Sequence, residues 1–563
     1  MEFIYLYFFT LLISLSFLGY GSFLLNVVDQ KLLKENIGYL GISGLFVCSV
    51  ISYLSIFFTK HDYFHNLVLH FIGISFFLYF IKNKKINFEK KKYLLIFSIL
   101  FIGLLILRNH DDFNYYHLTY SLGLTEDKLI LGLGNLGHGY THHSSIFFLN
   151  SIIFLPVIKY FLFHSIGWLT LFFVNLIFID KLLIKNKKIL DFEFYFYLLS
   201  FLFINFKFSR LGSFGTDLSG QIIFLTIFPL IFKLYSFKRI ENIDKSTLSL
   251  IVIVITYLTT LKSFMILNFL YLLPLIFFTT FKNLKYILIP KTVALGVIGL
   301  LSLITINLSY TGCAVYPVKQ TCLENKLEWS LSKKHVGEMK NWYEQWSKAG
   351  AGIEYRVENP NKYIQKFNWV PNWYERYFVY KFKETILGIL FLIILVMVLF
   401  VIKTKKKFIR VDNYTKRSIK ILSAVSCLLF FEWFFNHPAL RYGGYYLLAS
   451  IIFIPISFFL SKRKIFFDQK RTTIIFLIVL SFSLYNLKNF KRINEELKIV
   501  KGHNFPFFYS PKQSFKPTDI GNQIKIYVPT NLQGCWAIKT PCIHHSDHVI
   551  GKMLGSYKVI IKK

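Results

Sequence analysis

Long apolar stretches recur along the whole chain, and short lysine-rich connections separate them. The stretch from Thr385 to Val401 is typical, because none of its residues is charged. About 20 such residues in a helix cross the roughly 30 Å of hydrocarbon in a bilayer. Strands of a membrane barrel would instead alternate polar and apolar residues. The pattern therefore predicts an all-α polytopic membrane protein.

The composition agrees with a bilayer as the surrounding solvent. Of the 563 residues, 54% are hydrophobic, which is more than a soluble protein of this length can bury. The formal net charge is +35, but the lysines and arginines form many small clusters between apolar runs. Such clusters are typical of topology signals and of contact with anionic lipid. We expect the lipid bilayer as a partner and no nucleic acid.

Hydropathy predicts about fourteen transmembrane helices. They lie near residues 3–25, 38–58, 63–82, 93–107, 165–183, 191–207, 219–234, 247–261, 264–281, 289–308, 384–403, 417–434, 443–461 and 472–487. The first is expected to be a retained helix, since it lacks the basic start and the cleavage site of a signal peptide.

Lysine placement predicts the sidedness of these helices, because loops rich in Lys and Arg face the cytoplasm. Such loops fall on one side of the predicted topology, at residues 82–92, 181–188, 233–245, 403–417 and 462–471. The segment from Ser145 to Phe163 is apolar enough to span, but a full crossing would reverse the agreement downstream. We therefore predict a re-entrant or interfacial helix there, stopped near Pro156.

This topology divides the chain into six regions. Transmembrane helices occupy residues 1–107, 165–308 and 384–487, and the regions 108–164, 309–383 and 488–563 lie on the exterior side. The last region is predicted to be a small α+β domain, because Ile524–Pro529 and Tyr557–Ile561 have the pattern of short strands.

Four of the six cysteines lie in the two larger exterior regions, and the other two fall within predicted spans. Close spacing in an oxidising compartment predicts the disulfides Cys313–Cys322 and Cys535–Cys542. Reduced thiols, or cross-pairing between the two regions, are the alternatives.

The first exterior region begins with two adjacent carboxylates, Asp111 and Asp112, followed by Tyr116 and His117. Adjacent carboxylates can hold a divalent cation such as Mg²⁺ or Mn²⁺, with Asp112 as a ligand. One of them can instead act as the general base on an acceptor hydroxyl. The alternative without a functional role is a helix N-terminus, where Asp satisfies free amides.

A glycine-containing turn and three histidines follow. The turn LGLGN, Leu131–Asn135, lacks the context of a phosphate-binding loop and predicts a tight turn where the backbone approaches a ligand or a neighbouring helix. His138, His142 and His143 lack a recognised zinc spacing. We therefore expect Asn135 and His138 to contact substrate or lipid phosphate rather than metal.

Three later positions add polar groups on the same face. Asp217 precedes a span and is either a helix cap or a second acidic group of the site. Lys262 interrupts apolar sequence, so it either snorkels to the interface or binds a lipid phosphate. A third exterior turn carries His437 and Arg441, both candidate substrate contacts. The planar guanidinium of Arg441 matches the geometry of phosphate oxygens. Alternatively, the turn is an anchor in the aromatic belt at the membrane interface. The tail cluster His544–His548 is expected to be polar surface.

These motifs resemble an uncharacterised family of bacterial multi-pass membrane proteins. The first exterior loop of that family reads approximately D-x-G-L-Y-H-L, then P-G-L-G-N-L-H-G, then N-S-S-W-F. The matching positions are Asp112, Tyr116 to Leu118, Leu131 to Leu136, Ser144, Ser145, Phe147, Asp217, Lys262, Thr311 to Pro317, Arg441 to Gly443 and Cys535 to Cys542. The departures are Tyr115, in place of a small hydrophobic residue, and Gly139 and Tyr140 after His138, where relatives more often have Gly and Arg.

That family is similar in layout to GT-C glycosyltransferases, which combine many spans, an acidic motif in the first large exterior loop and a soluble C-terminal part. The resemblance implies a polyprenyl-phosphate-linked sugar donor, an inverting transfer, and a cell-envelope glycan or lipid acceptor. It places the active face on the periplasmic or exterior side of the bacterial inner membrane.

In this comparison Asp112, together with Asp111, is the general base or a cation ligand. Lys262 and Arg441 would hold the lipid phosphate, and Asp217 would assist the acceptor or the metal. Rival hypotheses are a transporter or flippase for lipid-linked glycans, a polysaccharide polymerase, and a non-catalytic envelope assembly protein.

Overall fold

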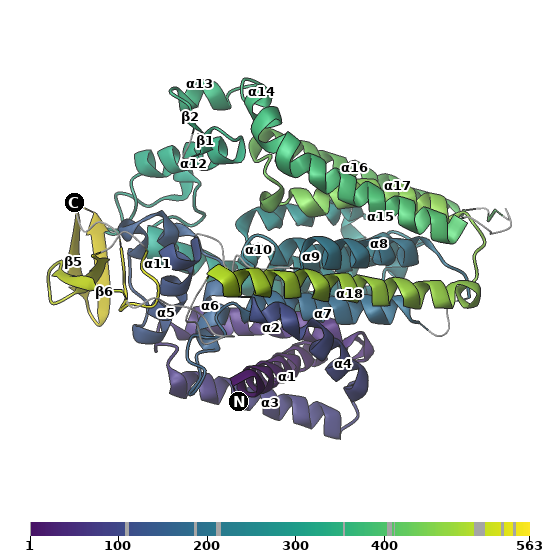
Figure 1. Ribbon diagram of the computed structural model, residues 1–563, viewed down its shortest axis with the longest axis horizontal. Coiled ribbons are helices and arrows are strands. Elements are labelled where there is room, and N and C mark those ends of the chain that lie inside the picture. Colours follow the sequence, from purple (N-terminus) through teal and green to yellow (C-terminus); the bar gives the residue numbers. More distant parts are fainter. Residues whose placement is uncertain are drawn as a thin grey trace.

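The computed structural model describes residues 2–106, 112–184, 188–209, 215–352, 355–401, 408–409, 411–499, 513–530, 534–543 and 548–562. Helices dominate it, and most of them run roughly along the long axis of the molecule (Figure 1).

The part of the chain that the structure describes contains nine helices that are long and apolar enough to cross a membrane. They are α1 (Glu2–Val28), α2 (Ile37–Ser55), α3 (Tyr63–Lys82), α7 (Ser165–Leu182), α11 (Pro290–Thr311), α15 (Lys383–Val401), α16 (Asn413–Asn436), α17 (Gly444–Ser461) and α18 (Phe467–Ile499). The chain is therefore a multi-pass membrane protein.

The five other predicted spans fall on shorter elements, so the structure does not confirm a count of about fourteen. These elements are α4 (Lys90–Leu100) with the 3-10 helix η2 (Phe101–Leu105), α8 (Phe192–Lys207), α9 (Ser219–Leu234), α10 (Lys245–Leu261), and the 3-10 helices η7 (Ser263–Tyr271) and η8 (Leu273–Phe278).

Two of these spans differ from the expected continuous α-helix. Near residues 93–107 the α-helix ends at Leu100, whose carbonyl accepts hydrogen bonds from Trp168 of α7 and Tyr485 of α18. Near residues 264–281 the chain forms 3-10 turns, and Pro274 at the start of η8 lacks the N–H that would continue an α-helix. At Leu100, side chains of neighbouring helices thus replace a backbone hydrogen bond that a continuous α-helix would make for itself.

The segment predicted to be re-entrant forms α6 (Ser145–Ile152), which ends four residues before Pro156. Side chains of α3 hold that end. Asn66 Nδ2 donates to the carbonyls of Ser151 and Phe154 at 2.9 Å each, and a ring nitrogen of His70 lies 3.1 Å from the carbonyl oxygen of Ile152. An eight-residue helix is only about 12 Å long and cannot cross a bilayer. Its depth in the membrane stays a prediction.

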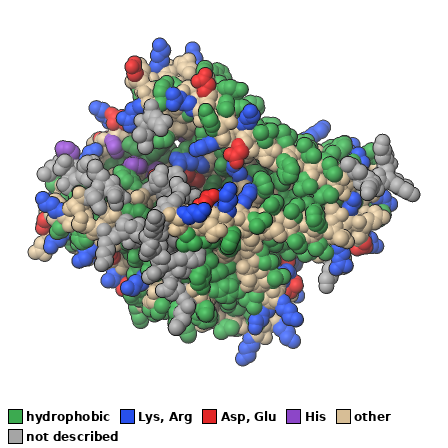
Figure 2. All heavy atoms as spheres, viewed as in Figure 1, with side chains coloured by type: hydrophobic (Ala, Val, Ile, Leu, Met, Phe, Trp, Pro, Cys, Tyr) green, Lys and Arg blue, Asp and Glu red, His purple; other side chains and the backbone are tan. Residues whose placement is uncertain are grey.

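Some helices are buried in the centre of the bundle, and others expose apolar side chains at its outer surface. Nearly every residue of α7, α8 and α9 is buried. In contrast, α15 exposes Leu387, Phe391 and Ile394, each by more than half of its surface. Figure 2 shows such apolar side chains covering the broad face of the helical bundle. This distribution fits helices whose outer faces contact lipid tails.

One end of the molecule carries the segments between the spans (Figure 1). They include α5 (Leu118–Glu126), α12 (Lys333–Ser347), α13 (Pro360–Ile364), α14 (Val370–Trp373) and the short antiparallel pair β1 (Ala351–Gly352) and β2 (Tyr355–Arg356). The C-terminal part adds two antiparallel hairpins, β3 (Phe515–Asp519) with β4 (Lys525–Pro529), and β5 (Val549–Leu554) with β6 (Tyr557–Lys562).

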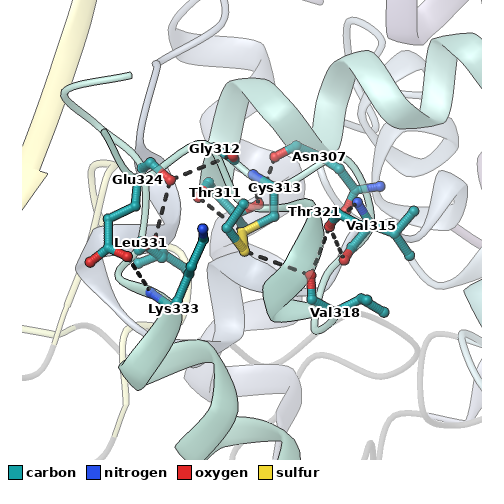
Figure 3. Close-up of a disulfide and its surroundings, with 12 residues drawn as sticks. Asn307, Thr311, Gly312, Cys313, Val315, Val318, Thr321, Glu324, Leu331 and Lys333 are labelled. Atoms are coloured by element: carbon teal, nitrogen blue, oxygen red, sulfur yellow. Dashed lines mark hydrogen bonds between the residues drawn. A yellow bond between two sulfur atoms is a disulfide. The ribbon is translucent and has the colours of Figure 1, made fainter. Parts of the chain in front are cut away.

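Both predicted disulfides are confirmed, Cys313–Cys322 and Cys535–Cys542. The first closes a loop directly after α11 (Figure 3). In that loop Thr321 Oγ1 donates to the carbonyls of Val315 and Val318. The disulfide and this hydroxyl together hold a short loop that makes little regular secondary structure of its own.

Candidate functional site

Three polar side chains far apart in the sequence meet at one ion-paired cluster. Lys262 Nζ lies 2.6 Å from Oδ1 of Asp217, and Arg441 Nε lies 3.9 Å from its Oδ2. Asp217 precedes α9, Lys262 follows α10, and Arg441 lies in the 3-10 turn η12 (Leu440–Tyr442) between α16 and α17. The packing of four helices therefore assembles the cluster.

The local backbone explains how Lys262 and Arg441 leave their helices. α10 ends at Leu261, and Lys262 adopts an extended conformation before the 3-10 turns begin. Gly443 follows Arg441 with φ +106°, a conformation that glycine adopts without steric cost. The chain can thus turn sharply into α17 and leave the guanidinium on the turn.

A buried glutamine on α9 fixes the arginine turn against the aspartate turn. Gln221 Nε2 donates to the carbonyls of Asp217 at 2.9 Å and Arg441 at 2.8 Å. Its Oε1 accepts from the backbone N–H groups of Tyr445 and Tyr446 in the first turn of α17. One side chain therefore caps a neighbouring helix and holds both partners of the Asp217–Arg441 pair.

The electrostatics of the cluster favour charged side chains. Burial alone would raise the pKa of Asp217, but Lys262 and Arg441 outweigh it and lower the pKa below the ordinary 3.8. The pKa of Arg441 is raised despite burial, through Tyr442 and Asp217. Lys262 and Arg441 still expose 26% and 42% of their side chains, so both cations can reach a ligand.

Tyr442 lies beside both cations. Arg441 Nη2 is 2.6 Å from the Tyr442 hydroxyl, to which it donates a hydrogen bond. The Tyr442 ring centroid is 5.9 Å from Lys262 Nζ. An aromatic face at this distance attracts a cation. It therefore helps to hold both positive charges in place without neutralising them.

The acidic loop, which we define as residues 112–144 of the first exterior region, interacts with this cluster through Asp112 and Tyr116. Asp112 precedes the π-helical turn η3 (Phe113–His117), which continues into α5. Burial raises the pKa of Tyr116, and the charges of Asp112 and Asp217 raise it further while Arg441 opposes them. The charge of Asp112 also contributes to the raised pKa of Arg441. The loop and the ion-paired cluster therefore form one electrostatic site.

Histidines line the same region. The ring of His138 stacks on Tyr115 at 5.6 Å, and the ring of His142 lies 5.3 Å from Tyr343 of α12. Burial lowers the pKa of both histidines, and the charge of Lys262 lowers that of His142 further. His142 is thus a neutral polar group at neutral pH. His117 is buried in the same region.

Two further predicted binding residues, Asn135 and His437, make other contacts. Asn135 Nδ2 donates to the backbone carbonyls of Trp329 and Ile560, which indicates a structural tie. A methyl group at Gly132 would lie 2.1 Å from the Ile560 carbonyl oxygen, so the close approach expected of this turn is to β6. His437 ends α16 with its ring 6.4 Å from that of Tyr442.

The predicted divalent cation has no complete ligand set in the described part of the chain. No three His, Cys, Asp or Glu side chains lie close enough together there to hold a metal ion. Asp111 lies outside the described residues. Asp217 is already paired with Lys262 and Arg441. Asp112 as a metal ligand stays a prediction.

The C-terminal domain forms hydrogen bonds to the acidic loop at three positions. The backbone N–H of Trp536 donates to the Asn114 carbonyl at 2.9 Å. The hydroxyl of Thr540 donates to Glu126 at the end of α5, and Tyr140 donates its hydroxyl hydrogen to the Cys542 carbonyl at 2.8 Å. These contacts come from the loop closed by Cys535–Cys542. They hold the residues on both sides of Tyr116 and His138.

The comparisons with known proteins give a family but no activity. Residues 1–448 match the family model described as Domain of unknown function (DUF8201). The chain belongs to this family. No curated protein and no solved structure matches it. The DUF8201 match includes Asp112, Asp217, Lys262 and Arg441, whereas the Cys535–Cys542 loop, which contacts the acidic loop, follows the matched residues.

Sequence reasoning missed Gln221, although a signal was present. It is an amide in the first turn of an apolar span of this DUF8201 chain, four residues after Asp217. A polar side chain within apolar sequence at such a position needs a partner in the folded protein. Its partners, in the turn before α17, come from a segment more than 200 residues away, which local sequence does not reveal.

The ion-paired cluster predicts a specific dependence of stability on pH. We expect Asp217→Asn to lower the free energy of unfolding by about 2 kcal/mol at neutral pH, because it leaves two partly buried cations without their carboxylate. The lowered pKa means that this contribution is present above about pH 4 and is lost as the pH falls through the native pKa. Thermal unfolding in detergent at several pH values measures it. Exposed Glu358→Gln is the control.

A difference between wild type and Asp217→Asn that stays constant down to about pH 2 would contradict this assignment, since protonated Asp217 cannot pair with Lys262.

The hydrogen bonds from the C-terminal domain predict that backbone amides of the acidic loop are protected from hydrogen exchange. We expect Thr540→Val to speed amide hydrogen exchange across residues 113–126 by about fivefold, because the hydroxyl bond to Glu126 is lost while the backbone N–H of position 540 keeps its own bond to the same carboxylate. Thr540→Ser keeps the hydroxyl and should restore protection. Thr518→Val on β3 is the matched control. Unchanged exchange in Thr540→Val would show that the loop is held without this contact.

Proposed function

We propose that the chain is an integral-membrane glycosyltransferase of the GT-C type. It would transfer a sugar from a polyprenyl-phosphate donor to a cell-envelope glycan or lipid acceptor. The observation that carries the proposal is the meeting of two partly exposed cations, Lys262 and Arg441, with the acidic loop of Asp112 at one end of a membrane-spanning bundle. The lysine distribution supports placing this end on the periplasmic or exterior face of a bacterial inner membrane.

The two cations suit a phosphate that becomes a leaving group. The planar guanidinium of Arg441 can present two N–H groups to phosphate oxygens, and Lys262 adds a point charge. Both are already in place through Asp217, so little reorganisation accompanies the charge that develops on the phosphate. Asp217 thereby acts as a positioning residue in the proposed reaction.

Asp112 is the proposed general base. Its carboxylate would take the proton of the acceptor hydroxyl as that oxygen bonds to the anomeric carbon of the sugar. The bond from this carbon to the donor phosphate oxygen breaks in the same step, and its electron pair leaves with the lipid phosphate. A single displacement of this kind inverts the configuration of the sugar. Tyr116 and His138, whose ring centroids lie 6.2 Å apart, are the proposed contacts to the sugar or the acceptor.

The test is sugar transfer by the purified protein in nanodiscs, with a labelled polyprenyl-phosphate-linked sugar. We expect Lys262→Gln and Arg441→Gln each to raise the donor KM about tenfold or more, because each loses a charged contact to phosphate. Lys245→Gln, at the opposite end of α10, is the matched control. Movement of the intact lipid-linked sugar across vesicles without transfer would favour the flippase hypothesis instead. Neither transfer nor movement with any donor would favour an assembly protein.

A further inference from the structure

A second group of cations lies where the C-terminal end of α8 meets the second half of α18, apart from the ion-paired cluster. Lys207 ends α8, and Lys488 and Arg492 lie one turn apart on α18, hence on the same face of that helix. Lys488 Nζ donates to the carbonyl of Phe206 at 2.9 Å. Arg492 Nη1 donates to Ser209 Oγ at 3.1 Å. The two helices therefore bring three positive charges into one patch.

Nearby carboxylates only partly balance this patch. Glu384 lies 3.6 Å from Lys207 Nζ, but 73% of its side chain is exposed. Glu495 and Glu496 act on Arg492 through their charges. Glu495 also lies 3.9 Å from Lys491 on the same helix.

Within the described part of the chain, some donor groups of the patch have no hydrogen-bond acceptor. An ammonium has three N–H donors and a guanidinium has five. Among the described residues, the hydrogen bonds of Lys488 and Arg492 use one nitrogen of each side chain. Capping of the last carbonyls of α8 explains Lys488. Helix capping does not explain why Lys207 and Arg492 lie beside Lys488, since three like charges repel one another.

The patch borders a surface suited to lipid tails. On α18, Leu487 and Phe490 expose 65% and 56% of their surface, and on α15, Leu387 and Phe391 expose 55% and 57%. Both helices pack against α8. Figure 2 shows basic side chains gathered at the end of α18, beside the apolar face of the bundle. Cations at the edge of an apolar membrane surface can meet a charged headgroup while the tails follow the helices.

The aromatic side chain of Tyr445 lies beside the patch. Lys207 Nζ lies 5.6 Å from the ring centroid of Tyr445. The backbone of Tyr445 is held by Gln221, which also holds the Arg441 carbonyl. The two cationic regions thus lie on one end of the bundle but make their contacts through different residues.

We propose that Lys207, Lys488 and Arg492 bind the phosphate group of a lipid whose hydrocarbon chains lie along α15 and α18. The guanidinium provides paired donors and the two ammonium groups provide point charges. This proposal stands independently of the glycosyltransferase reaction, since it uses none of the residues assigned to donor or acceptor.

The test measures retained lipid by native mass spectrometry after reconstitution in nanodiscs of phosphatidylcholine with phosphatidylglycerol. We expect the double variant Lys488→Gln/Arg492→Gln to retain phosphatidylglycerol with about fivefold lower affinity for each charge removed. Lys491→Gln/Lys498→Gln removes two charges from the same helix outside the patch and should retain the lipid. Lys207→Gln gives an independent variant on α8, with an expected loss of about fivefold.

Further arms distinguish the source of the phosphate. Polyprenyl phosphate and phosphatidylglycerol should compete for the patch, whereas inorganic phosphate at the same concentration should not. Equal retention in the double variant and its control would overturn the proposal. So would displacement of the lipid by inorganic phosphate alone, because that would show a site for the free ion.

Discussion

Asp112→Asn should reduce sugar transfer by about 10²- to 10⁴-fold, the usual contribution of a general base. The amide keeps nearly the same shape but cannot accept the proton of the acceptor hydroxyl. Its neighbours support the role, because the charge of Asp112 acts on Tyr116, His138 and Arg441. The measurement is the initial rate of transfer from the polyprenyl-phosphate donor at saturating acceptor.

The controls separate chemistry from folding and from donor binding. Asp127→Asn removes a carboxylate from the same loop, where Asp127 pairs with Lys558 at 2.7 Å, and should leave most of the activity. Donor KM should change little in Asp112→Asn, in contrast to Arg441→Gln. Unchanged donor consumption by Asp112→Asn, in a protein that transfers sugar, would remove Asp112 from the mechanism while leaving the phosphate assignment open to its own test.

Gln221→Leu should lower the free energy of unfolding by about 3 kcal/mol, a large loss for a single side chain. Leucine fills a similar volume, but it leaves the carbonyl of Arg441 and the N–H groups of Tyr445 and Tyr446 without the partner they have in the native protein. Gln221 itself is 1% exposed, so water cannot easily replace the amide. Thermal or denaturant unfolding in detergent measures the loss.

A second buried glutamine provides the matched control. Gln345 is also 1% exposed, but among the described residues its side chain donates one hydrogen bond, to the carbonyl of Gly350 at 2.7 Å. Gln345→Leu should therefore cost about 1 kcal/mol. Equal losses in the two variants would show that the several bonds of Gln221 add nothing beyond one buried hydrogen bond. If the glycosyltransferase proposal holds, Gln221→Leu should also raise the donor KM, because it frees the Arg441 turn.

Local patterns predicted much of the architecture. Hydropathy indicated helices that cross a membrane, and nine of the predicted spans correspond to long apolar helices in the described part of the chain. Cysteine spacing predicted both disulfides, and alternating residues predicted β4 and β6. These properties depend on residues that are neighbours in the sequence, so the sequence carries their signal directly.

Hydropathy was less informative about the form of the shorter apolar segments. It measures the preference for lipid over water, which an α-helix and a run of 3-10 turns satisfy alike. The end of α4 at Leu100 depends on side chains of α7 and α18, and the end of α6 depends on Asn66 and His70 of α3. Such ends are decided by partners that lie elsewhere in the chain.

The repeated apolar stretches by themselves determined that this protein is embedded in a bilayer. Local composition singled out Asp112, Asp217, Lys262 and Arg441 as charged residues next to apolar sequence. Only the tertiary structure decided that Asp217 pairs with Lys262 and Arg441, and that the C-terminal domain grips the acidic loop. The physical reason is that hydropathy acts on each segment separately, whereas ion pairs and buried hydrogen bonds need groups that helix packing brings within about 4 Å.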